Sequence, residues 1–141
     1  MYGAEEIKTF IPQREPFMMV DKLFSASDDS VETGLTVREE NLFVSGGEFA
    51  ETGLIEHIAQ SAACFAGYND WKNNRPVVLG YIAEIKNFSL ENTVKTGDEL
   101  FSTLKVLSNV MNITMMEAVT VKKDGQRAAS CRIKIFMDRK K

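Results

Sequence analysis

The sequence predicts an α+β fold in which a curved antiparallel sheet wraps around one long central helix. Residues 52–67 are apolar over most of a helical circumference, so this helix is expected to be buried on nearly all sides. The segments around it carry the alternation and turn signals of strands, about two before the helix and four after it. Runs of strands around a single helix favour α+β over parallel βαβ units.

The chain before the helix predicts a short helix, the two strands of a hairpin and an irregular segment, over residues 4–10, 17–24, 30–38 and 38–52. Val31, Thr33 and Leu35 alternate with polar or small neighbours, which is typical of a half-buried strand. Gly46 and Gly47 lie in the irregular segment, where a tight turn is one interpretation because glycine accepts a positive φ.

The central helix carries three polar side chains, Glu56, His57 and Gln60, among apolar ones. A buried carboxylate is costly unless it is paired or protonated, which makes Glu56 the first candidate for a functional residue. Thr52 is a plausible N-cap, and Gly67 is expected to help end the helix. The small residues of this helix also allow the backbone of other segments to pack close to it.

The chain after the helix predicts a polar connection over residues 69–76 and then strands to the end. Residues 77–90 hold one or two strands, and further strands are expected over 100–110, 112–121 and 128–137. Asp124-Gly125 is a strong hairpin signal between the last two. Such a sheet leaves edge strands, and pairing them across a two-fold axis would cover them, so we expect a homodimer or a related heterodimer.

Composition indicates an ordinary soluble domain with a sizeable core, because 44% of the 141 residues are hydrophobic and 26% are charged. The net charge of -3 gives no basic excess for nucleic-acid binding. No run is apolar enough to span a membrane and no secretory signal is evident, so a cytoplasmic protein is expected.

Cys64 and Cys131 lie in stretches with an apolar pattern and are expected to be reduced core residues. One histidine and two separated cysteines predict no metal site, and no phosphate-binding glycine loop predicts a nucleotide cofactor. Five methionines are expected to be mostly core filler: Met18, Met19, Met111, Met115 and Met116.

Three stretches of the chain resemble, in the right order, the 3-hydroxyacyl-(acyl carrier protein) dehydratases of the hotdog fold. Residues 11–22 read IPQREPFMMVDK, similar to the family's N-terminal motif LPHRxPFLLVDR. Residues 55–60 read IEHIAQ, similar to its helix motif, in which an acidic residue precedes AxAQ. Residues 80–88, GYIAEIKNF, and the later Gly97-Asp98 are similar to the next strand and turn. The resemblance implies a single hotdog domain over residues 1–141.

In that family a histidine of the facing protomer removes the proton next to the thioester carbonyl, and the helix carboxyl group protonates the departing hydroxyl. Glu56 matches this acid. Amides at the helix N-terminus polarise the carbonyl, and the match places Gly53 and Leu54 there. The resemblance therefore implies a thioester of acyl carrier protein or coenzyme A as substrate, in fatty acid or polyene biosynthesis, with no cofactor.

The sequence departs from the family where that histidine is expected. The family carries it in a segment like FFxGHFP before the helix, whereas residues 42–49 here read LFVSGGEF. Gly47, preceded by Gly46, stands about where the histidine would be. A Gly-Gly segment ahead of an acidic helix motif resembles the dehydratase-like subunits of aryl polyene and flexirubin-type pigment clusters. This resemblance implies a second hotdog subunit that supplies the histidine, with Gly46 and Gly47 leaving space for it.

Three functions stay open at this point. The chain is a dehydratase-type subunit with Glu56 as acid or base, a thioesterase in which Glu56 activates water, or a non-catalytic partner of an active hotdog subunit. His57 either replaces the missing base across an interface or is a structural histidine that hydrogen-bonds a backbone carbonyl. Gln60 is expected to support the preceding loop by hydrogen bonds.

Overall fold

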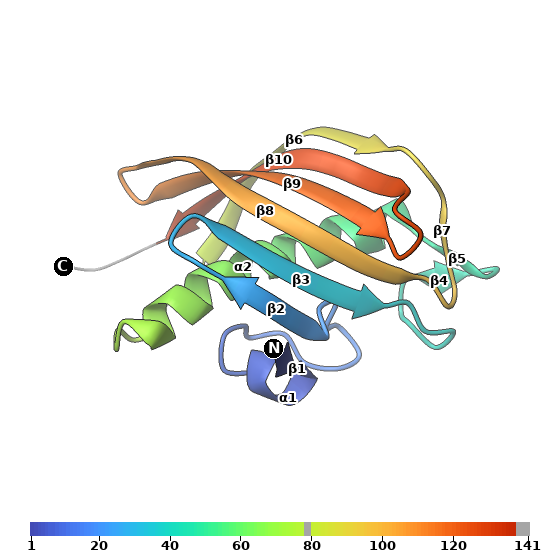
Figure 1. Ribbon diagram of the computed structural model, residues 1–141, viewed down its shortest axis with the longest axis horizontal. Helices are drawn as coiled ribbons and strands as arrows, with labels where there is room; N and C mark the ends of the chain where they lie inside the picture. Colours follow the sequence, from blue (N-terminus) through green and yellow to red (C-terminus); the bar gives the residue numbers. More distant parts are fainter. Residues whose placement is uncertain (78–79, 138–141) are drawn as a thin grey trace.

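The computed structural model describes residues 1–77 and 80–137, and within them seven strands form one antiparallel sheet. These strands are β1 (Tyr2–Gly3), β2 (Lys22–Ala26), β3 (Ser30–Thr36), β6 (Gly80–Leu90), β8 (Glu99–Val110), β9 (Ile113–Lys122) and β10 (Arg127–Met137). Their order is β1-β2-β3-β8-β9-β10-β6. The sheet curves over the long helix α2 (Glu51–Lys72), with the short helix α1 (Ala4–Ile7) below it (Figure 1). The predicted arrangement of a sheet around one helix is confirmed.

A second, small sheet lies at the N-terminal end of α2. It consists of β4 (Val44–Ser45), β5 (Glu48–Phe49) and β7 (Val94–Lys95), in the order β4-β5-β7. Gly46 and Gly47 form the turn between its first two strands, with φ angles of 59° and 78°. The segment predicted to be irregular therefore contains a hairpin, and the pairing of β7 with it is a feature that sequence reasoning missed.

Helix α2 is longer at both ends than the predicted 52–67. It begins at Glu51 after Ala50, whereas Thr52 is exposed and does not cap it. It continues past Gly67 to Lys72, so the expectation that Gly67 helps to end the helix is wrong. Gly67 instead lies against the backbone of Phe10, and a Cβ atom at this position would come within 2.8 Å of the Phe10 Cα. A glycine is required here for close packing.

The last turns of α2 are covered by the N-terminal segment of the chain. Tyr2, Phe10, Tyr68 and Trp71 form an aromatic cluster with ring centroids 5.7–6.3 Å apart. Asp70 is fully buried, and the Nε of Arg75 lies 3.2 Å from its Oδ1. The polar connection predicted over 69–76 is therefore helical to Lys72, because the aromatic cluster and the pairing of buried Asp70 with Arg75 support this last turn.

The described residues form two apolar clusters in the interior, one under the middle of the sheet and one near the start of α2. The larger includes Ile58, Leu104 and Ile133, and the smaller is built around Leu54. Cys64 and Cys131 are buried free thiols of the larger cluster. Burial raises the pKa of the Cys64 thiol to about 12 and that of Cys131 to about 11, as expected for inert core cysteines.

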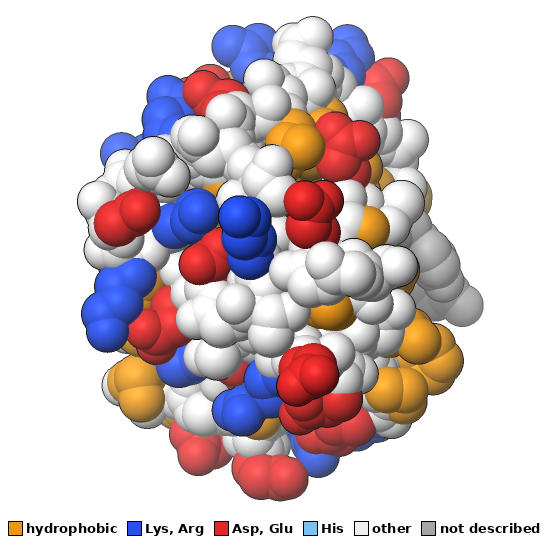
Figure 2. Space-filling view, turned by 90° about the vertical axis from the view of Figure 1, so that its right-hand side faces the viewer, with side chains coloured by type: hydrophobic (Ala, Val, Ile, Leu, Met, Phe, Trp, Pro, Cys, Tyr) orange, Lys and Arg blue, Asp and Glu red, His pale blue; other side chains and the backbone are white. Residues whose placement is uncertain are grey.

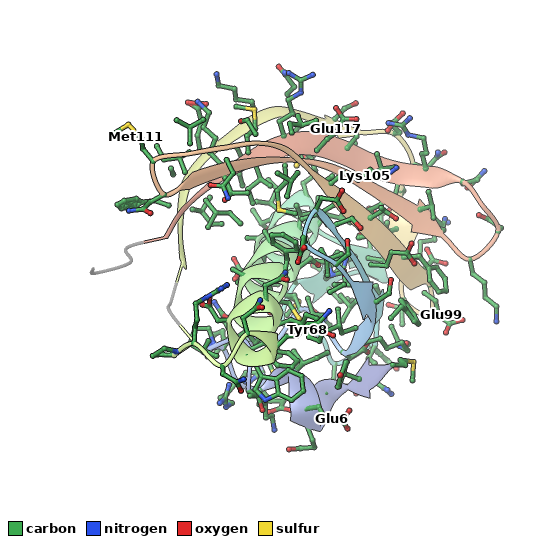
Figure 3. All side chains as sticks on the ribbon, turned by 60° about the vertical axis from the view of Figure 1, so that its left-hand side comes forward. Glu6, Tyr68, Glu99, Lys105, Met111 and Glu117 are labelled. Atoms are coloured by element: carbon green, nitrogen blue, oxygen red, sulfur yellow. The ribbon has the colours of Figure 1, made fainter. Side chains whose placement is uncertain are left out.

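The hairpin between β8 and β9 extends beyond the cover of the helix, and Met111 stands at its tip (Figure 3). The Met111 side chain is 90% exposed, so its assignment to the core was wrong. Met111 and Asn112 both have a positive φ, 49° and 68°, which is uncommon for a residue with a bulky side chain. Met19 and Met116, by contrast, are completely buried as expected.

The surface has mixed charge. On the face shown in Figure 2, acidic and basic side chains are interspersed with polar and apolar ones. Several of the charges are paired, as in the contact of 3.3 Å between Lys122 and Asp98. Among the described helices, none has an apolar stretch of the length needed to cross a bilayer.

Candidate active site

Glu56 lies on α2, within its first two turns, and its side chain is half-buried. Its Oε1 accepts a hydrogen bond of 2.9 Å from the Nε2 of Gln60. The two residues are four positions apart, which places them on the same face of the helix. In the described part of the chain, the second carboxylate oxygen, Oε2, has no hydrogen-bond partner. Glu56 thus has one oxygen fixed and the other available to a ligand.

Gln60 is almost completely buried and uses its whole amide group. Its Oε1 accepts from the Met19 amide at 2.7 Å, and its Nε2 donates to the Phe17 carbonyl at 2.8 Å as well as to Glu56. Gln60 therefore binds the backbone of residues 17–19, not the loop before the helix. This segment was predicted as the start of a strand, but the first long strand, β2, begins only at Lys22.

His57 is completely buried, so it is turned towards the core and not towards the half-exposed face that carries Glu56. Its Nδ1 lies 2.7 Å from the Met19 carbonyl oxygen, and its Nε2 lies 2.8 Å from the Ser102 Oγ. Ser102 in turn lies 2.6 Å from the Thr120 Oγ1. Burial lowers the pKa of His57, although the hydrogen bond to Met19 opposes this shift. Both ring nitrogens are occupied inside the subunit.

The amides of Gly53 and Leu54 are hydrogen-bonded within the first turn of the helix. Both donate to the carbonyl oxygen of Ala50, at 2.9 and 3.2 Å, because α2 begins at Glu51, earlier than predicted. These bonds count against the expectation that the two amides polarise a substrate carbonyl, which stays a prediction. Gly53 has a packing role instead, since a Cβ atom there would lie 2.6 Å from the ring of Phe49.

Gly46 and Gly47 lie on an exposed turn. A Cβ atom on either would meet nothing within 4 Å, so the positive φ, and not a close contact, is the reason for glycine. The carbonyl of Gly47 accepts a hydrogen bond of 3.0 Å from the Thr96 amide, which ties the turn to the end of β7. The turn has open space around it.

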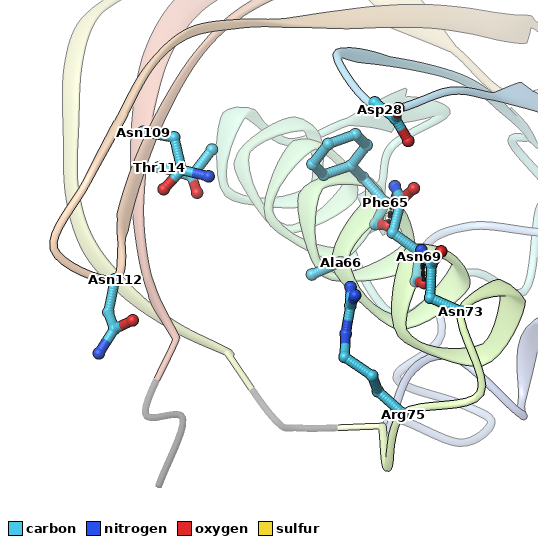
Figure 4. A pocket seen from close by; sticks show the side chains of 9 residues that line it. All are labelled: Asp28, Phe65, Ala66, Asn69, Asn73, Arg75, Asn109, Asn112 and Thr114. Atoms are coloured by element: carbon cyan, nitrogen blue, oxygen red, sulfur yellow. Dashed lines mark hydrogen bonds between the residues drawn. The ribbon is translucent and has the colours of Figure 1, made fainter. Parts of the chain in front are cut away.

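A cavity of about 540 Å³ lies at the opposite end of α2 from Glu56 (Figure 4). Polar side chains dominate its lining, among them Asn69, Arg75 and Asn109. Asn69 is thirteen positions from Glu56 on the same helix, or about 20 Å along the axis, so this cavity is separate from the candidate site. A second cavity, of about 360 Å³, is lined by Met18 and Val20 and borders the segment that Gln60 holds.

A stripe of small and apolar side chains runs along α2 beside Glu56. Ile55, Ala59 and Ala63 are spaced four residues apart and remain only partly buried. Within residues 1–77 and 80–137, no group of three or more His, Cys, Asp and Glu side chains is arranged to hold a metal ion.

Sequence reasoning identified Glu56, His57 and Gln60 but not the residues that bind their side chains. Ser102 and Thr120 come from β8 and β9, and the Met19 peptide comes from the N-terminal segment. One signal was present: Ser102 shares the inward register of β8 with Leu100 and Leu104, where an apolar side chain is expected. A polar residue in that register indicates a buried polar partner.

Comparison with known proteins identifies relatives of this arrangement. The sequence profile of the ApeP-like family, described as ApeP dehydratase, matches residues 5–141. The chain is 31% identical over 106 residues to the 3-hydroxyacyl-[acyl-carrier-protein] dehydratase FabZ of Halalkalibacterium halodurans, covering 71% of this chain and 74% of that protein. It is 27% identical to the FabZ of Bacillus thuringiensis, covering 71% of this chain and 72% of that protein.

Solved structures share its fold. The dehydratase heterocomplex ApeI:P from Xenorhabdus doucetiae contains a chain with a TM-score of 0.86 at 16% identity, covering 95% of this chain and 91% of that one. The E. coli PaaI protein from the phenylacetic acid degradation operon has a TM-score of 0.68 at 13% identity, covering 82% and 81%. The predicted hotdog fold is thereby confirmed. Since its profile match extends over nearly the whole sequence, the chain belongs to the ApeP-like dehydratase family.

Proposed function

We propose that the chain is a dehydratase-type subunit acting on 3-hydroxyacyl groups carried as thioesters on acyl carrier protein, with Glu56 as its acid. The observation that carries this proposal is the Glu56 carboxylate, half-buried on α2, with Oε1 held by Gln60 and Oε2 open. Membership of the ApeP-like dehydratases and the likeness to FabZ support the substrate class.

The reaction removes water across C2 and C3 of the acyl group. A base takes the proton from C2, and the electrons of that C–H bond form the C2–C3 double bond. The bond from C3 to the hydroxyl oxygen breaks, and protonated Glu56 gives its proton to the oxygen so that water leaves. Before the next turnover the base must give up the proton it took from C2, and Glu56 must take up a proton, which restores its acid form.

The base is proposed to come from another subunit. The chain has one histidine, and His57 is buried with both ring nitrogens engaged. A second hotdog subunit that brings a histidine to Glu56 would complete the pair. The likeness to a chain of the ApeI:P heterocomplex agrees with such an assembly.

Two surfaces support a partner at this place. Strand β6 stands at one end of the sheet order, and its Ile82 and Leu90 side chains are each 41% exposed. The partly buried stripe of Ile55, Ala59 and Ala63 lies beside Glu56. We propose that one partner covers both, and that the open turn at Gly46 and Gly47 leaves room for its catalytic group.

The test uses this chain and a hotdog subunit that carries the family's His-Phe-Pro motif, each alone and both together. Dehydration of a 3-hydroxyacyl thioester is followed by the absorbance of the enoyl product. We expect turnover from the pair and a loss of at least about 100-fold in Glu56→Gln. Glu51→Gln, on the exposed first turn of the same helix, is the matched control and should stay within about twofold.

Three results would contradict the proposal. Full activity of the Glu56→Gln pair would exclude Glu56 as the acid. Equal activity of the partner with and without this chain would favour a non-catalytic role. Glu56-dependent hydrolysis of the thioester by the isolated chain would favour the thioesterase alternative.

A further inference from the structure

We propose that His57 is a positioning residue for Glu56 and acts through the main chain of Met19 and through Gln60. The proposal depends on the proposed function only in so far as Glu56 is the acid of the reaction. It starts from the hydrogen bonds of the buried imidazole, which run in two directions. One leads to the N-terminal segment and the other into the sheet.

The protons of this network have one consistent arrangement. The Met19 carbonyl oxygen can only accept, so the Nδ1 of His57 must carry a hydrogen. In a neutral ring Nε2 is then an acceptor, and the Ser102 hydroxyl donates to it. Ser102 has a single hydroxyl hydrogen, so the Thr120 hydroxyl must donate to Ser102. The donors run in sequence from Thr120 through Ser102 and His57 to Met19.

The surroundings of the ring favour its neutral form. Its contacts are a carbonyl and a hydroxyl, and it is completely buried. Asp21, the acidic residue that acts on it electrostatically, has its oxygens engaged by Lys22 at 2.9 Å and by the Thr36 amide at 3.1 Å. A charged ring without a counter-ion in contact would be costly to bury. The neutral ring with hydrogen on Nδ1 satisfies every partner.

The main chain of Met19 is held at both its N–H and its C=O by one helix. His57 binds its carbonyl and Gln60 binds its amide, from positions one turn apart on α2. The bond to the Met19 amide fixes Oε1 of Gln60 as the acceptor, so the Nε2 group must face Phe17 and Glu56. A displaced Met19 main chain would rotate or move Gln60, and the hydrogen bond to Glu56 would change with it.

A side chain that only filled space would not need this network. Ser102 and Thr120 are buried in the register of apolar residues, and each polar group there is costly unless it is bonded. The side chains of Thr120, Ser102 and His57 hydrogen-bond one another in sequence, and the last bond goes to the Met19 carbonyl. The network therefore positions the main chain of Met19. Met19 in turn positions Gln60, which binds Glu56.

Two neutral variants separate the two ends of the imidazole. The amide nitrogen of Asn occupies the place of Nδ1, so His57→Asn keeps a donor for Met19 and loses the contact to Ser102. The amide of Gln reaches the place of Nε2, so His57→Gln keeps a contact to Ser102 and loses the donor for Met19. Each variant loses one buried hydrogen bond, so we expect similar losses of stability. Their effects on Glu56 should differ.

The first readout is the rate of the assembled complex. We expect His57→Gln to lower kcat on the order of tenfold with KM unchanged, because the acid is misplaced. His57→Asn should stay within about threefold of the native chain. Equal losses in both variants, or a loss only in His57→Asn, would overturn the proposal.

The second readout is independent of activity. Nitrogen NMR of the single histidine should show hydrogen on Nδ1 and none on Nε2 at pH 7. The side-chain amide signals of Gln60 should shift in His57→Gln and stay in place in His57→Asn. A charged ring, hydrogen on Nε2 alone, or unmoved Gln60 signals in His57→Gln would overturn the positioning role. Absence of dehydration with these NMR results intact would instead count against the proposed function.

Discussion

Lowering the pH is expected to destabilise the folded chain through His57. Burial lowers the pKa of His57 in the folded state below its ordinary value of 6.5. Below pH 6.5 the unfolded chain therefore binds a proton that the folded chain does not bind, and the free energy of unfolding falls. The stabilisation that depends on the neutral ring is complete above pH 6.5 and is lost as the pH falls below this value.

The size of the effect follows from one proton. If the ring stays neutral in the folded chain, each pH unit well below 6.5 costs about 1.4 kcal/mol. Between pH 7 and pH 5 the loss is about 2 kcal/mol from this residue alone. Carboxyl groups also titrate in this range, so the native curve by itself does not isolate the histidine.

Comparison with His57→Asn removes that problem, because Asn does not titrate. Urea unfolding of both proteins at a fixed protein concentration, from pH 7 to pH 5, gives two curves of unfolding free energy against pH. We expect the difference between them to shrink by about 2 kcal/mol towards low pH. Parallel curves would refute the reasoning, because they would mean that the folded and unfolded chains take up the histidine proton equally.

The remaining predictions concern packing, thiol reactivity and the exposed hairpin. Gly67→Ala should lower the free energy of unfolding by about 1–3 kcal/mol, measured in urea, because its methyl group would meet the backbone of Phe10; unchanged stability would contradict the close approach. Cys64 and Cys131 should react with a thiol reagent only at the rate of unfolding, because both thiols are buried and burial raises their pKa values. Rapid labelling in native buffer would contradict the burial of these thiols. Met111→Asn should raise Tm slightly and leave the fold unchanged, because Asn tolerates a positive φ better than Met does. A drop in Tm would show that the Met111 side chain makes stabilising contacts.

The fold was predictable because its signals are local. Alternation defined the strands after the helix, and the Asp124-Gly125 turn lies where the hairpin closes. The end of α2 was misjudged because Asn69 and Asp70 are typical of loops. Only the tertiary structure shows that the Asp70 carboxylate is buried beside Arg75 and that an aromatic cluster covers the same turn. Long-range contacts here override local preference.

The candidate site was predictable only in part, for a related reason. The spacing of Glu56 and Gln60 is enough to place them in contact on a helix. The two hydrogen bonds of the His57 ring join residues 38 and 45 positions apart, and the bond from Ser102 to Thr120 joins residues 18 positions apart, so no local pattern reveals them. The start of the helix was also misjudged: the N-cap is Ala50, two residues before the predicted Thr52, and the Ala50 carbonyl accepts from the Gly53 amide.

The way α2 holds residues 17–19 has a consequence for which substitutions this segment tolerates. The helix binds this segment through the Phe17 carbonyl and through the main-chain N–H and C=O of Met19. All residues have these groups, except that proline has no amide hydrogen. Phe17, whose side chain is 58% exposed, should accept most amino acids in a selection for folded protein. Position 19 should reject proline even though the ring would be apolar. The hold of α2 on this segment therefore depends on the main chain of residue 17 and not on its side chain.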